Sequence, residues 1–179
     1  GELEFASGWI ERKERLLARD LVRRLVSYLR DAERAGTTLV GAEPKFEVRL
    51  PQDGHEHDAI LSGVIDRVER RSDGAIDIVD LKTGKSEKTS AAAIAENAQL
   101  AAYQLAFEAG AIEGLGDAGH AENGGAKLLV LRSASQKDYL DPRQLPFDED
   151  SRAAFHARLR RAVEVMTGAQ FVAAFEEHC

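Results

Sequence analysis

Two aspartates and a lysine stand at the ends of two apolar runs that follow one another in the chain. Asp66 comes directly after the first run, and Asp80 and Lys82 come at the end of the second. Because side chains alternate along a β-strand, the spacing of Asp80 and Lys82 predicts that both point to one face. Asp73 and Gly74, between the runs, are typical of a hairpin turn. The pattern therefore predicts that Asp66 and Asp80 lie on adjacent strands.

These residue types fit the metal-dependent hydrolysis of a phosphodiester. The reaction needs a nucleophilic water, neutralisation of charge on the phosphate and help for the leaving oxygen, which one or two divalent ions supply. Mg²⁺ prefers oxygen ligands and keeps several waters, so Asp66, Asp80 and the carbonyl of Leu81 are candidate ligands for Mg²⁺ or Mn²⁺. The ammonium of Lys82 would position the attacking water or stabilise the transition state.

An Asp-x-Lys pattern by itself is also typical of an ion pair on the surface of a strand. The neighbouring residues argue for a site, because Asp80 follows a run of β-branched apolar residues. An acid at the end of such a strand is unfavourable unless it is paired, bound to a cation or exposed at a cleft. Asp66 follows an apolar pair in the same way.

Periodic apolar residues predict the elements that position these side chains. A first helix is expected at about residues 8–35, where leucines recur at helical spacing, and Gly36 would end it. Three strands joined by short connections are expected to form an antiparallel meander. Their approximate ranges are 39–50, 59–69 and 75–81.

The second half of the chain predicts two helices around one buried strand. The first helix is expected at about 91–109, with Thr89 or Ser90 as its N-cap, and the second at 151–166. Residues 127–132 are almost continuously apolar, which is typical of a strand that is buried on both faces and parallel to a neighbour. The order helix, three strands, helix, strand, helix predicts the α/β class with a mixed sheet.

Composition narrows the kind of protein. With 179 residues, 44% of them hydrophobic and 31% charged, the chain fits one globular domain. It contains no apolar stretch of membrane-spanning length and does not begin like a signal peptide, and its single cysteine, Cys179, cannot form an internal disulfide. We therefore expect a cytoplasmic protein with no membrane partner.

The net charge of −7 argues against a generally basic protein that coats DNA. Basic residues nevertheless gather at 12–34, in the first predicted helix, and Lys82, Lys85 and Lys88 follow the acidic motif. Acidic residues interrupt the basic ones in the helix, so a solvated amphipathic face is the favoured interpretation there. The lysines after Asp80 are harder to attribute to solvated charge alone.

Three successive motifs resemble those of the RecB-type nucleases, a branch of the PD-(D/E)xK superfamily. They are Gly-Val-Ile-Asp-Arg-Val-Glu at 63–69, Ile-Val-Asp-Leu-Lys-Thr-Gly-Lys at 78–85 and Gln-Leu-Ala-Ala-Tyr at 99–103. The resemblance implies an αβββαβ restriction-endonuclease-like core, to which the pattern adds a C-terminal helix. It also implies a Mg²⁺- or Mn²⁺-dependent deoxyribonuclease of the exonuclease type.

The resemblance assigns a role to each matching residue. Asp66 and Asp80 would be metal ligands, Lys82 the catalytic lysine, and Gln99 and Tyr103 a helical pair that borders the site. Gln99 and Tyr103 are four residues apart and therefore share a helix face. Without the family argument, Tyr103 fits an ordinary core residue equally well.

A looser resemblance extends to the nuclease domains at the C-terminal ends of actinobacterial helicase-nucleases of the AdnAB and AddAB kind (UvrD/Rep-like). The phrases that carry it lie at 3–12, 99–106 and 124–132. It implies that residues 1–179 are a single nuclease domain of a larger protein for DNA double-strand-break repair. The partners would be DNA, above all single strands, a helicase motor in the same parent chain and a second helicase-nuclease subunit. Within the domain we expect an N-terminal helix at 1–38, the nuclease core at 39–132, and a C-terminal helix and tail at 133–179.

Two features depart from the family pattern. RecB-type sites usually have a histidine ligand on a helix before the first strand, and the first predicted helix has none. His55 and His57 form a pair that can bind metal, but a solvated hairpin is favoured for their turn. Cys179 alone cannot hold the iron-sulfur cluster of many relatives, since such clusters take four thiolates, so a cluster belongs only to a longer parent chain. Excision from a larger protein would explain both departures.

The missing histidine also limits the expected activity. A metal would be held less firmly without it, so we expect weak or absent activity from the isolated chain. The alternative function is a noncatalytic DNA-binding or scaffolding module that retains the nuclease fold, and a standalone nuclease with a different partner is a third possibility.

Glu43 resembles the acid at the start of the family's first strand, with a strand-edge glutamate as the alternative. His120 and His156 show no partner pattern.

Overall fold

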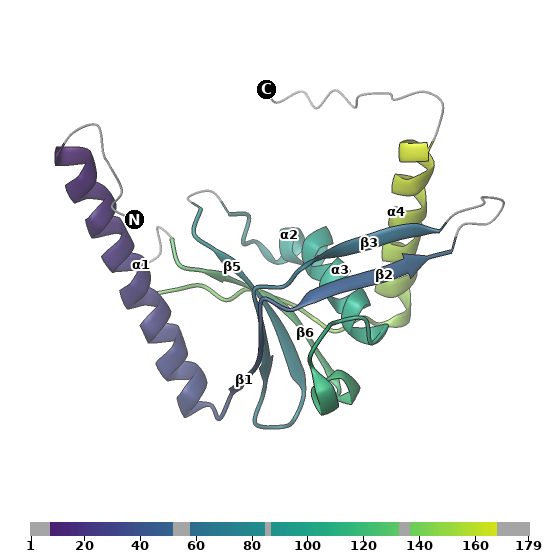
Figure 1. Cartoon of the computed structure of the whole chain (residues 1–179), viewed down its shortest axis with the longest axis horizontal. Coiled ribbons are helices and arrows are strands. Elements are labelled where there is room, and N and C mark those ends of the chain that lie inside the picture. The colour runs from purple at the N-terminus through teal and green to yellow at the C-terminus, as the bar shows by residue number, and fades with distance from the viewer. Residues whose placement is uncertain (1–7, 52–57, 85–86, 133–136, 168–179) are drawn as a thin grey trace.

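Five strands form a mixed sheet at the centre of the protein, in the order β1-β4-β5-β6-β7 (Figure 1). They are β1 (Thr38–Ala42), β4 (Arg67–Arg70), β5 (Ile76–Lys82), β6 (Asn123–Val130) and β7 (Arg143–Gln144). β5 and β6 are parallel, and the other neighbours are antiparallel. A second sheet has two antiparallel strands, β2 (Lys45–Leu50) and β3 (Ala59–Val64). This computed structural model describes residues 8–51, 58–84, 87–132 and 137–167.

Each of the first two predicted strands is divided by a corner. β1 gives way to β2 at Glu43 and Pro44, and β3 gives way to β4 at Ile65 and Asp66. The backbone stays paired through the corner, because Glu43 N donates to Asp66 O at 3.1 Å and Ile65 N donates to Pro44 O at 3.0 Å. Glu43 has a φ of 52°, outside the strand region, and Pro44 has no N–H to donate. The predicted antiparallel meander is confirmed, but it bends from the large sheet into the small one.

β5 and β6 form the parallel pair in the middle of the large sheet. Both predicted strands are confirmed, although β6 begins at Asn123, earlier than expected. The helix α3 (Ala98–Glu108) lies in the connection between them, as a parallel pair requires. Alternate residues pack on opposite faces, so that Ile78 and Leu128 lie in a core cluster with α3, and Val79 and Leu129 lie in another with Tyr28.

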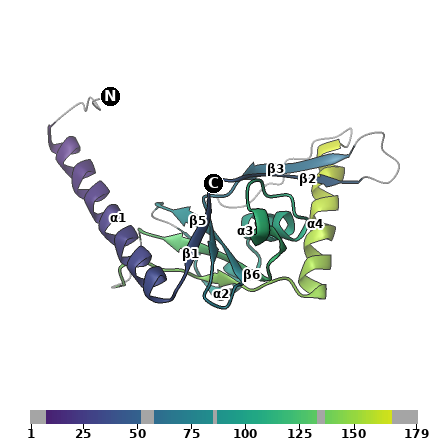
Figure 2. The ribbon, with the colours of Figure 1, turned by 60° about the horizontal axis from the view of Figure 1, so that its bottom comes forward.

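The helix α1 (Gly8–Arg34) packs on the sheet through its C-terminal half. The predicted helix is confirmed, and Gly36 has the left-handed φ of 72° expected just after a helix. Tyr28 is buried against the sheet, with half-buried Leu21 and Leu25 beside it. The N-terminal half of α1 projects past the sheet (Figure 1, Figure 2).

The helix predicted at 91–109 is divided into α2 (Ala91–Ala95) and α3. Ser90, one of the two predicted caps, accepts a hydrogen bond from Ala93 N at 3.3 Å. A second N-cap, Asn97, accepts from Leu100 N at 3.0 Å and begins α3. Because the backbone of Asn97 is extended, the first helix cannot continue through it.

The helix α4 (Glu149–Thr167) confirms the predicted C-terminal helix. Its Phe155 joins Ala101 and Leu105 of α3 in one buried cluster. The glycine-rich stretch between α3 and β6 contains a short 3₁₀ helix, η1 (Gly116–His120), and the short strand β7 has no counterpart in the sequence prediction. None of the helices in the described ranges is both long and apolar enough to cross a membrane.

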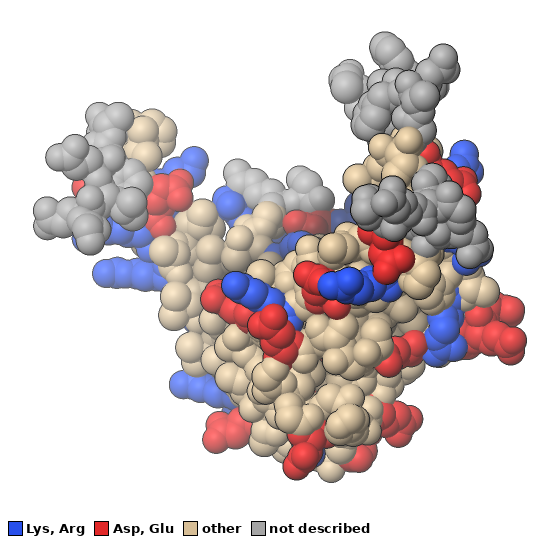
Figure 3. Space-filling view, turned by 45° about the vertical axis from the view of Figure 1, so that its right-hand side comes forward, with Lys and Arg blue, Asp and Glu red and all other residues tan. Residues whose placement is uncertain are grey.

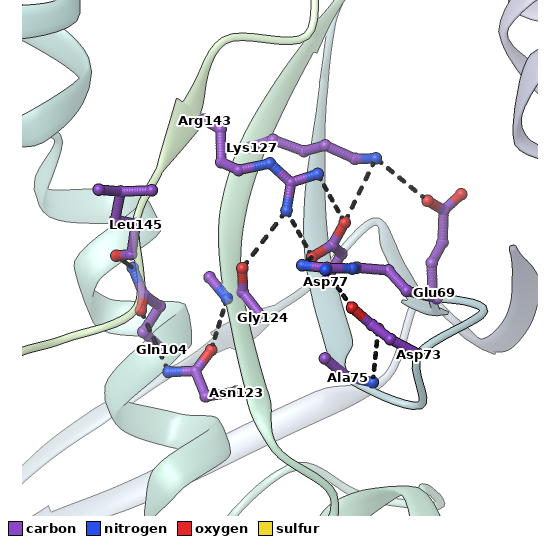
Figure 4. Close-up of polar contacts among 12 residues, drawn as sticks. Glu69, Asp73, Ala75, Asp77, Gln104, Asn123, Gly124, Lys127, Arg143 and Leu145 are labelled. Atoms are coloured by element: carbon purple, nitrogen blue, oxygen red, sulfur yellow. Dashed lines mark hydrogen bonds and ion pairs between the residues drawn. The ribbon is translucent and has the colours of Figure 1, made fainter. Parts of the chain in front are cut away.

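Charged side chains cross four strands on the face of the sheet that α1 covers (Figure 4). This charged ladder consists of Glu69, Asp77, Lys127 and Arg143, from β4, β5, β6 and β7 in turn. Arg143 donates two hydrogen bonds to Asp77, at 2.6 and 2.7 Å. Lys127 Nζ lies 3.4 Å from Glu69 Oε2 and 3.7 Å from Asp77 Oδ2. Tyr28 donates to Glu69 at 2.5 Å, so the ladder also ties α1 to the sheet.

Candidate active site

Asp80 and Lys82 stand together near the carboxyl end of β5, on the face of the sheet that α3 covers. Lys82 Nζ lies 2.7 Å from Asp80 Oδ2. Asp80 is 2% exposed, whereas the side chain of Lys82 is 26% exposed. The two residues share one face, as their spacing predicts, with the acid inside and the ammonium at the edge of solvent.

Asp66 reaches the same place from the corner between β3 and β4. The residue is exposed and lies at a bend, so its predicted position within a strand is wrong. Its Oδ2 accepts a hydrogen bond from Leu81 N at 2.6 Å. The N–H and C=O of one strand residue point to the same side, so the carbonyl of Leu81 also points toward Asp66. The corner therefore brings Asp66 beside the end of β5.

Gln99 and Tyr103 of α3 complete a ring of polar contacts with Asp80 and Lys82. Lys82 Nζ donates to Gln99 Oε1 at 2.9 Å, and Gln99 Nε2 donates to the Tyr103 hydroxyl at 2.8 Å. That hydroxyl lies 3.4 Å from Asp80 Oδ1 and 3.2 Å from the carbonyl oxygen of Val64. One hydroxyl hydrogen serves both acceptors. Burial raises the pKa of Tyr103 to about 12, so the hydroxyl is protonated near neutral pH and can donate.

Asp80 is an energetically unfavourable carboxylate. Burial raises its pKa, the nearby Lys82 lowers it, and the charge of Asp66 raises it again, so that the pKa lies above its ordinary value. The ammonium of Lys82 is within ion-pair distance of Asp80 Oδ2, yet no group in the described part of the chain makes a hydrogen bond of good geometry with that buried oxygen. An incompletely satisfied buried oxygen is costly and marks a place where a cation would be stabilising.

The donor atoms at this place fit a hard divalent cation. Asp66, Asp80 and the carbonyl of Leu81 offer oxygen only, which Mg²⁺ and Mn²⁺ accept. Across the described ranges, no group of three or more His, Cys, Asp or Glu residues is arranged to hold a metal. The protein would therefore supply two carboxylates and a carbonyl, and water would complete the coordination, as is usual for Mg²⁺.

The remaining sequence candidates lie elsewhere or outside the described residues. Among the described residues, the side chain of Glu43 makes no hydrogen bond or ion pair with the cluster, although its backbone N–H donates to the carbonyl oxygen of Asp66. His120 belongs to η1 and His156 to α4, and neither element contributes to the cluster. The residues His55, His57, Lys85 and Cys179 lie outside the described ranges.

Two residues that help to place α3 were not anticipated from the sequence. Asn97 carries a local signal, since Asn is a favoured N-cap and a second cap within a predicted helix marks a break. Gln144 carries no local signal, because it stands in a strand of two residues within an irregular stretch. Its side chain nevertheless contacts the junction between α2 and α3.

We expect Asp80→Asn to raise the melting temperature at neutral pH. Because the pKa of Asp80 is raised above 3.8, the folded state holds its proton more firmly than the unfolded state. Stability therefore falls as pH rises through the window between 3.8 and the raised pKa, and an uncharged amide of the same shape avoids that loss. In a domain of this size, each kcal/mol regained raises the melting temperature by about 2–4 °C.

Thermal unfolding followed by circular dichroism from about pH 3 to pH 8 measures this effect. The difference between Asp80→Asn and the unmodified protein should shrink toward low pH, where the carboxyl group is protonated in both states. Asp117→Asn, at an exposed acid of η1, is the matched control and should change little. A lower melting temperature for Asp80→Asn at neutral pH would show that the ion pair with Lys82 outweighs the burial.

The family model described as the PD-(D/E)XK nuclease superfamily matches residues 2–179. Among solved structures, the crystal structure of SSO0001 is similar, with 14% sequence identity, a TM-score of 0.46, and coverage of 84% of this chain and 61% of that one. The chain thus spans less than two thirds of that protein's length. A comparison with curated proteins gave no match.

Proposed function

Because the chain belongs to the PD-(D/E)XK nuclease superfamily, we propose that it is a metal-dependent nuclease domain that hydrolyses phosphodiester bonds in DNA. The observation that carries the proposal is the ring formed by Asp80, Lys82, Gln99 and Tyr103, with Asp66 beside it. A buried acid with a raised pKa next to a partly exposed lysine is typical of a catalytic site. In the mixed α/β fold, β5 carries Asp80 and Lys82, and α3 carries Gln99 and Tyr103.

The side chains divide the work of the reaction between them. Asp66, Asp80 and the Leu81 carbonyl would hold Mg²⁺ or Mn²⁺, which supplies a water of lowered pKa and neutralises charge on the phosphate. Lys82 reaches solvent and can hydrogen-bond the attacking water or the phosphate oxygens. Gln99 accepts from the ammonium and restrains its direction. Tyr103 donates toward Asp80 and so orients the carboxylate.

The substrate in this proposal is DNA, mainly as single strands that a helicase delivers during double-strand-break repair. On the face shown in Figure 3, Lys and Arg side chains are intermixed with Asp and Glu side chains, and the net charge of the chain is −7. Such a surface has modest affinity for phosphates, so a partner that feeds the strand would raise the local concentration of substrate. The looser resemblance to helicase-nucleases supports an exonuclease-type domain with a motor in the same parent chain and a second subunit.

One observation favours the alternative of a noncatalytic DNA-binding or scaffolding module. The described part of the chain offers no third acidic, histidine or cysteine ligand beside Asp66 and Asp80. A weakly held metal would give low activity and leave binding as the main role. The retained ring around Asp80 counts against this alternative, since binding alone does not require it.

The proposal is tested by incubating the intact parent protein, which contains residues 1–179 and the proposed helicase motor, with single-stranded DNA and Mg²⁺ or Mn²⁺. We expect cleavage that stops when EDTA removes the metal and returns when the metal is restored. Calorimetry with Mn²⁺ should show binding that Asp66→Asn and Asp80→Asn abolish and that Glu113→Gln, at an exposed acid outside the cluster, preserves. Metal binding without cleavage would favour the scaffolding alternative, and the absence of both would refute the proposed site.

A further inference from the structure

Gln144 of β7 occupies a buried position between the sheet and the junction of α2 with α3. It is 7% exposed. Its side-chain nitrogen Nε2 lies 2.9 Å from the carbonyl oxygen of Ile94, 3.0 Å from that of Ala95 and 3.2 Å from that of Asn97. An amide group has two hydrogens, so it serves these three carbonyls with shared bonds. One side chain from β7 thus hydrogen-bonds the backbone carbonyls where α2 ends and α3 begins.

Gln144 is itself held by a chain of side-chain amides that leads to β6. Gln104 of α3, fully buried, donates to Gln144 Oε1 at 2.9 Å. Asn123 at the start of β6 donates to Gln104 Oε1 at 3.1 Å and accepts from Gly125 N at 2.8 Å. Figure 4 shows Gln104 and Asn123 in contact beside β6. Each side-chain amide both donates and accepts, so the hydrogen bonds run in one direction, from Asn123 through Gln104 to Gln144, and fix the orientation of each amide.

The junction that Gln144 holds determines where Gln99 stands. α2 ends at Ala95, whose carbonyl oxygen accepts from Gln144, and the carbonyl of Ile94 accepts from both Gln144 and Asn97 N. α3 begins at Ala98, so Gln99 lies in its first turn, directly after the junction. Gln99 is the residue that accepts the hydrogen bond from Lys82. A shift of the junction would therefore move Gln99 and the oxygen that accepts the hydrogen bond from Lys82.

We propose that Gln144 is a positioning residue for the nuclease site, acting through the α2–α3 junction and Gln99 to set the direction of the Lys82 ammonium. The inference rests on the proposed function for its kinetic consequence, but the ordering of the junction can be measured without any activity. Arg143, the preceding residue, points to the opposite face and bonds Asp77 of the charged ladder. Strand alternation thus lets a strand of two residues support both faces of the sheet.

The first test is hydrogen exchange in Gln144→Met, which keeps the length of the side chain and removes the amide. We expect amide exchange within residues 91–103 to become roughly tenfold faster, because the carbonyl of Ala95 loses the donor of Gln144 and those of Ile94 and Asn97 keep only their backbone donors. Gln104→Met is a second variant, which should give a smaller effect in the same segment. Tyr28→Phe removes a hydrogen bond on the opposite face and should leave exchange in this segment unchanged. Unchanged exchange in both glutamine variants would overturn the inference.

The second test is a double-mutant cycle for DNA cleavage by the intact parent protein. Gln144→Met should lower kcat by about tenfold with KM within about twofold, at a temperature well below its melting midpoint. In a Gln99→Ala background the same substitution should cause little further loss, because both act on Lys82 through one path. Losses that multiply independently would overturn the inference. If the unmodified protein does not cut DNA, the proposed function fails, and the exchange measurement still decides whether Gln144 orders the junction.

Discussion

Replacing Lys82 by methionine is expected to lower the rate of DNA cleavage by about 10²- to 10³-fold, the loss that follows removal of one preorganised electrostatic group. Lys82 is the partly exposed cation of the site, 2.7 Å from Asp80 and hydrogen-bonded to Gln99. Methionine retains the aliphatic stem, so the packing of β5 against α3 should remain. The measurement is kcat with labelled single-stranded DNA under saturating Mn²⁺, together with circular dichroism to show that the fold is intact.

Lys88→Met is the matched control for this prediction. Lys88 is also a lysine that follows the acidic motif, but it is exposed and no described contact joins it to the ring. Its removal should change kcat by less than about threefold. If the Lys82 variant cut DNA as fast as the control, Lys82 would have no catalytic role. If both variants bound DNA less tightly by the same factor, the lysines would contribute only general attraction for phosphate.

Replacing Glu69 by glutamine is expected to lower the free energy of unfolding by about 3–5 kcal/mol, the usual loss when one partner of a buried ion pair is removed. Glu69 is fully buried in the charged ladder, where it accepts from Tyr28 and Arg67 and lies beside Lys127. Glutamine has nearly the same shape, so the loss would come from cations left without their counter-charge. Urea denaturation measures the change.

The effect of Glu69 should depend on pH. Burial raises the pKa of Glu69, but hydrogen bonds from Tyr28 and Arg67 and the charge of Lys127 outweigh it, so the pKa is lowered below 4.5. A lowered pKa contributes stability that is present above 4.5 and is lost as pH falls through the folded-state value. The gap between the variant and the unmodified protein should therefore be largest near neutral pH and should narrow as the pH falls below 4.5 toward the folded-state pKa.

Glu47→Gln provides the control for the ladder. Glu47 is an exposed residue of β2 whose nearest ion-pair partner, Arg49, is 4.0 Å away. An exposed pair of this kind contributes about 0–1 kcal/mol, so the control should be close to neutral. A Glu69 variant as stable as the control would show that the ladder does not stabilise the sheet.

Elements with strong local periodicity were predictable from the sequence. α1, β5 and α4 lie close to their expected ranges, because a continuous apolar face at one period is sufficient to specify a helix or a strand. The corners were not predictable in the same way. The apolar alternation continues through Ile65, whereas the change of direction depends on the backbone at Glu43 and Pro44 on the neighbouring strand. Similarly, the charged ladder joins β4 and β5 to β6 and β7, which lie much later in the chain.

The sequence by itself determined which residue types the site contains and which two pairs of them share a face. Asp80 and Lys82 share a strand face, and Gln99 and Tyr103 share a helix face, because backbone periodicity fixes both. Only the tertiary structure decided that the two pairs close into one ring, that Asp66 reaches β5 from a corner, and that Gln144 secures the start of α3. These contacts join residues distant in the sequence, and their geometry depends on how the sheet and the helices pack together.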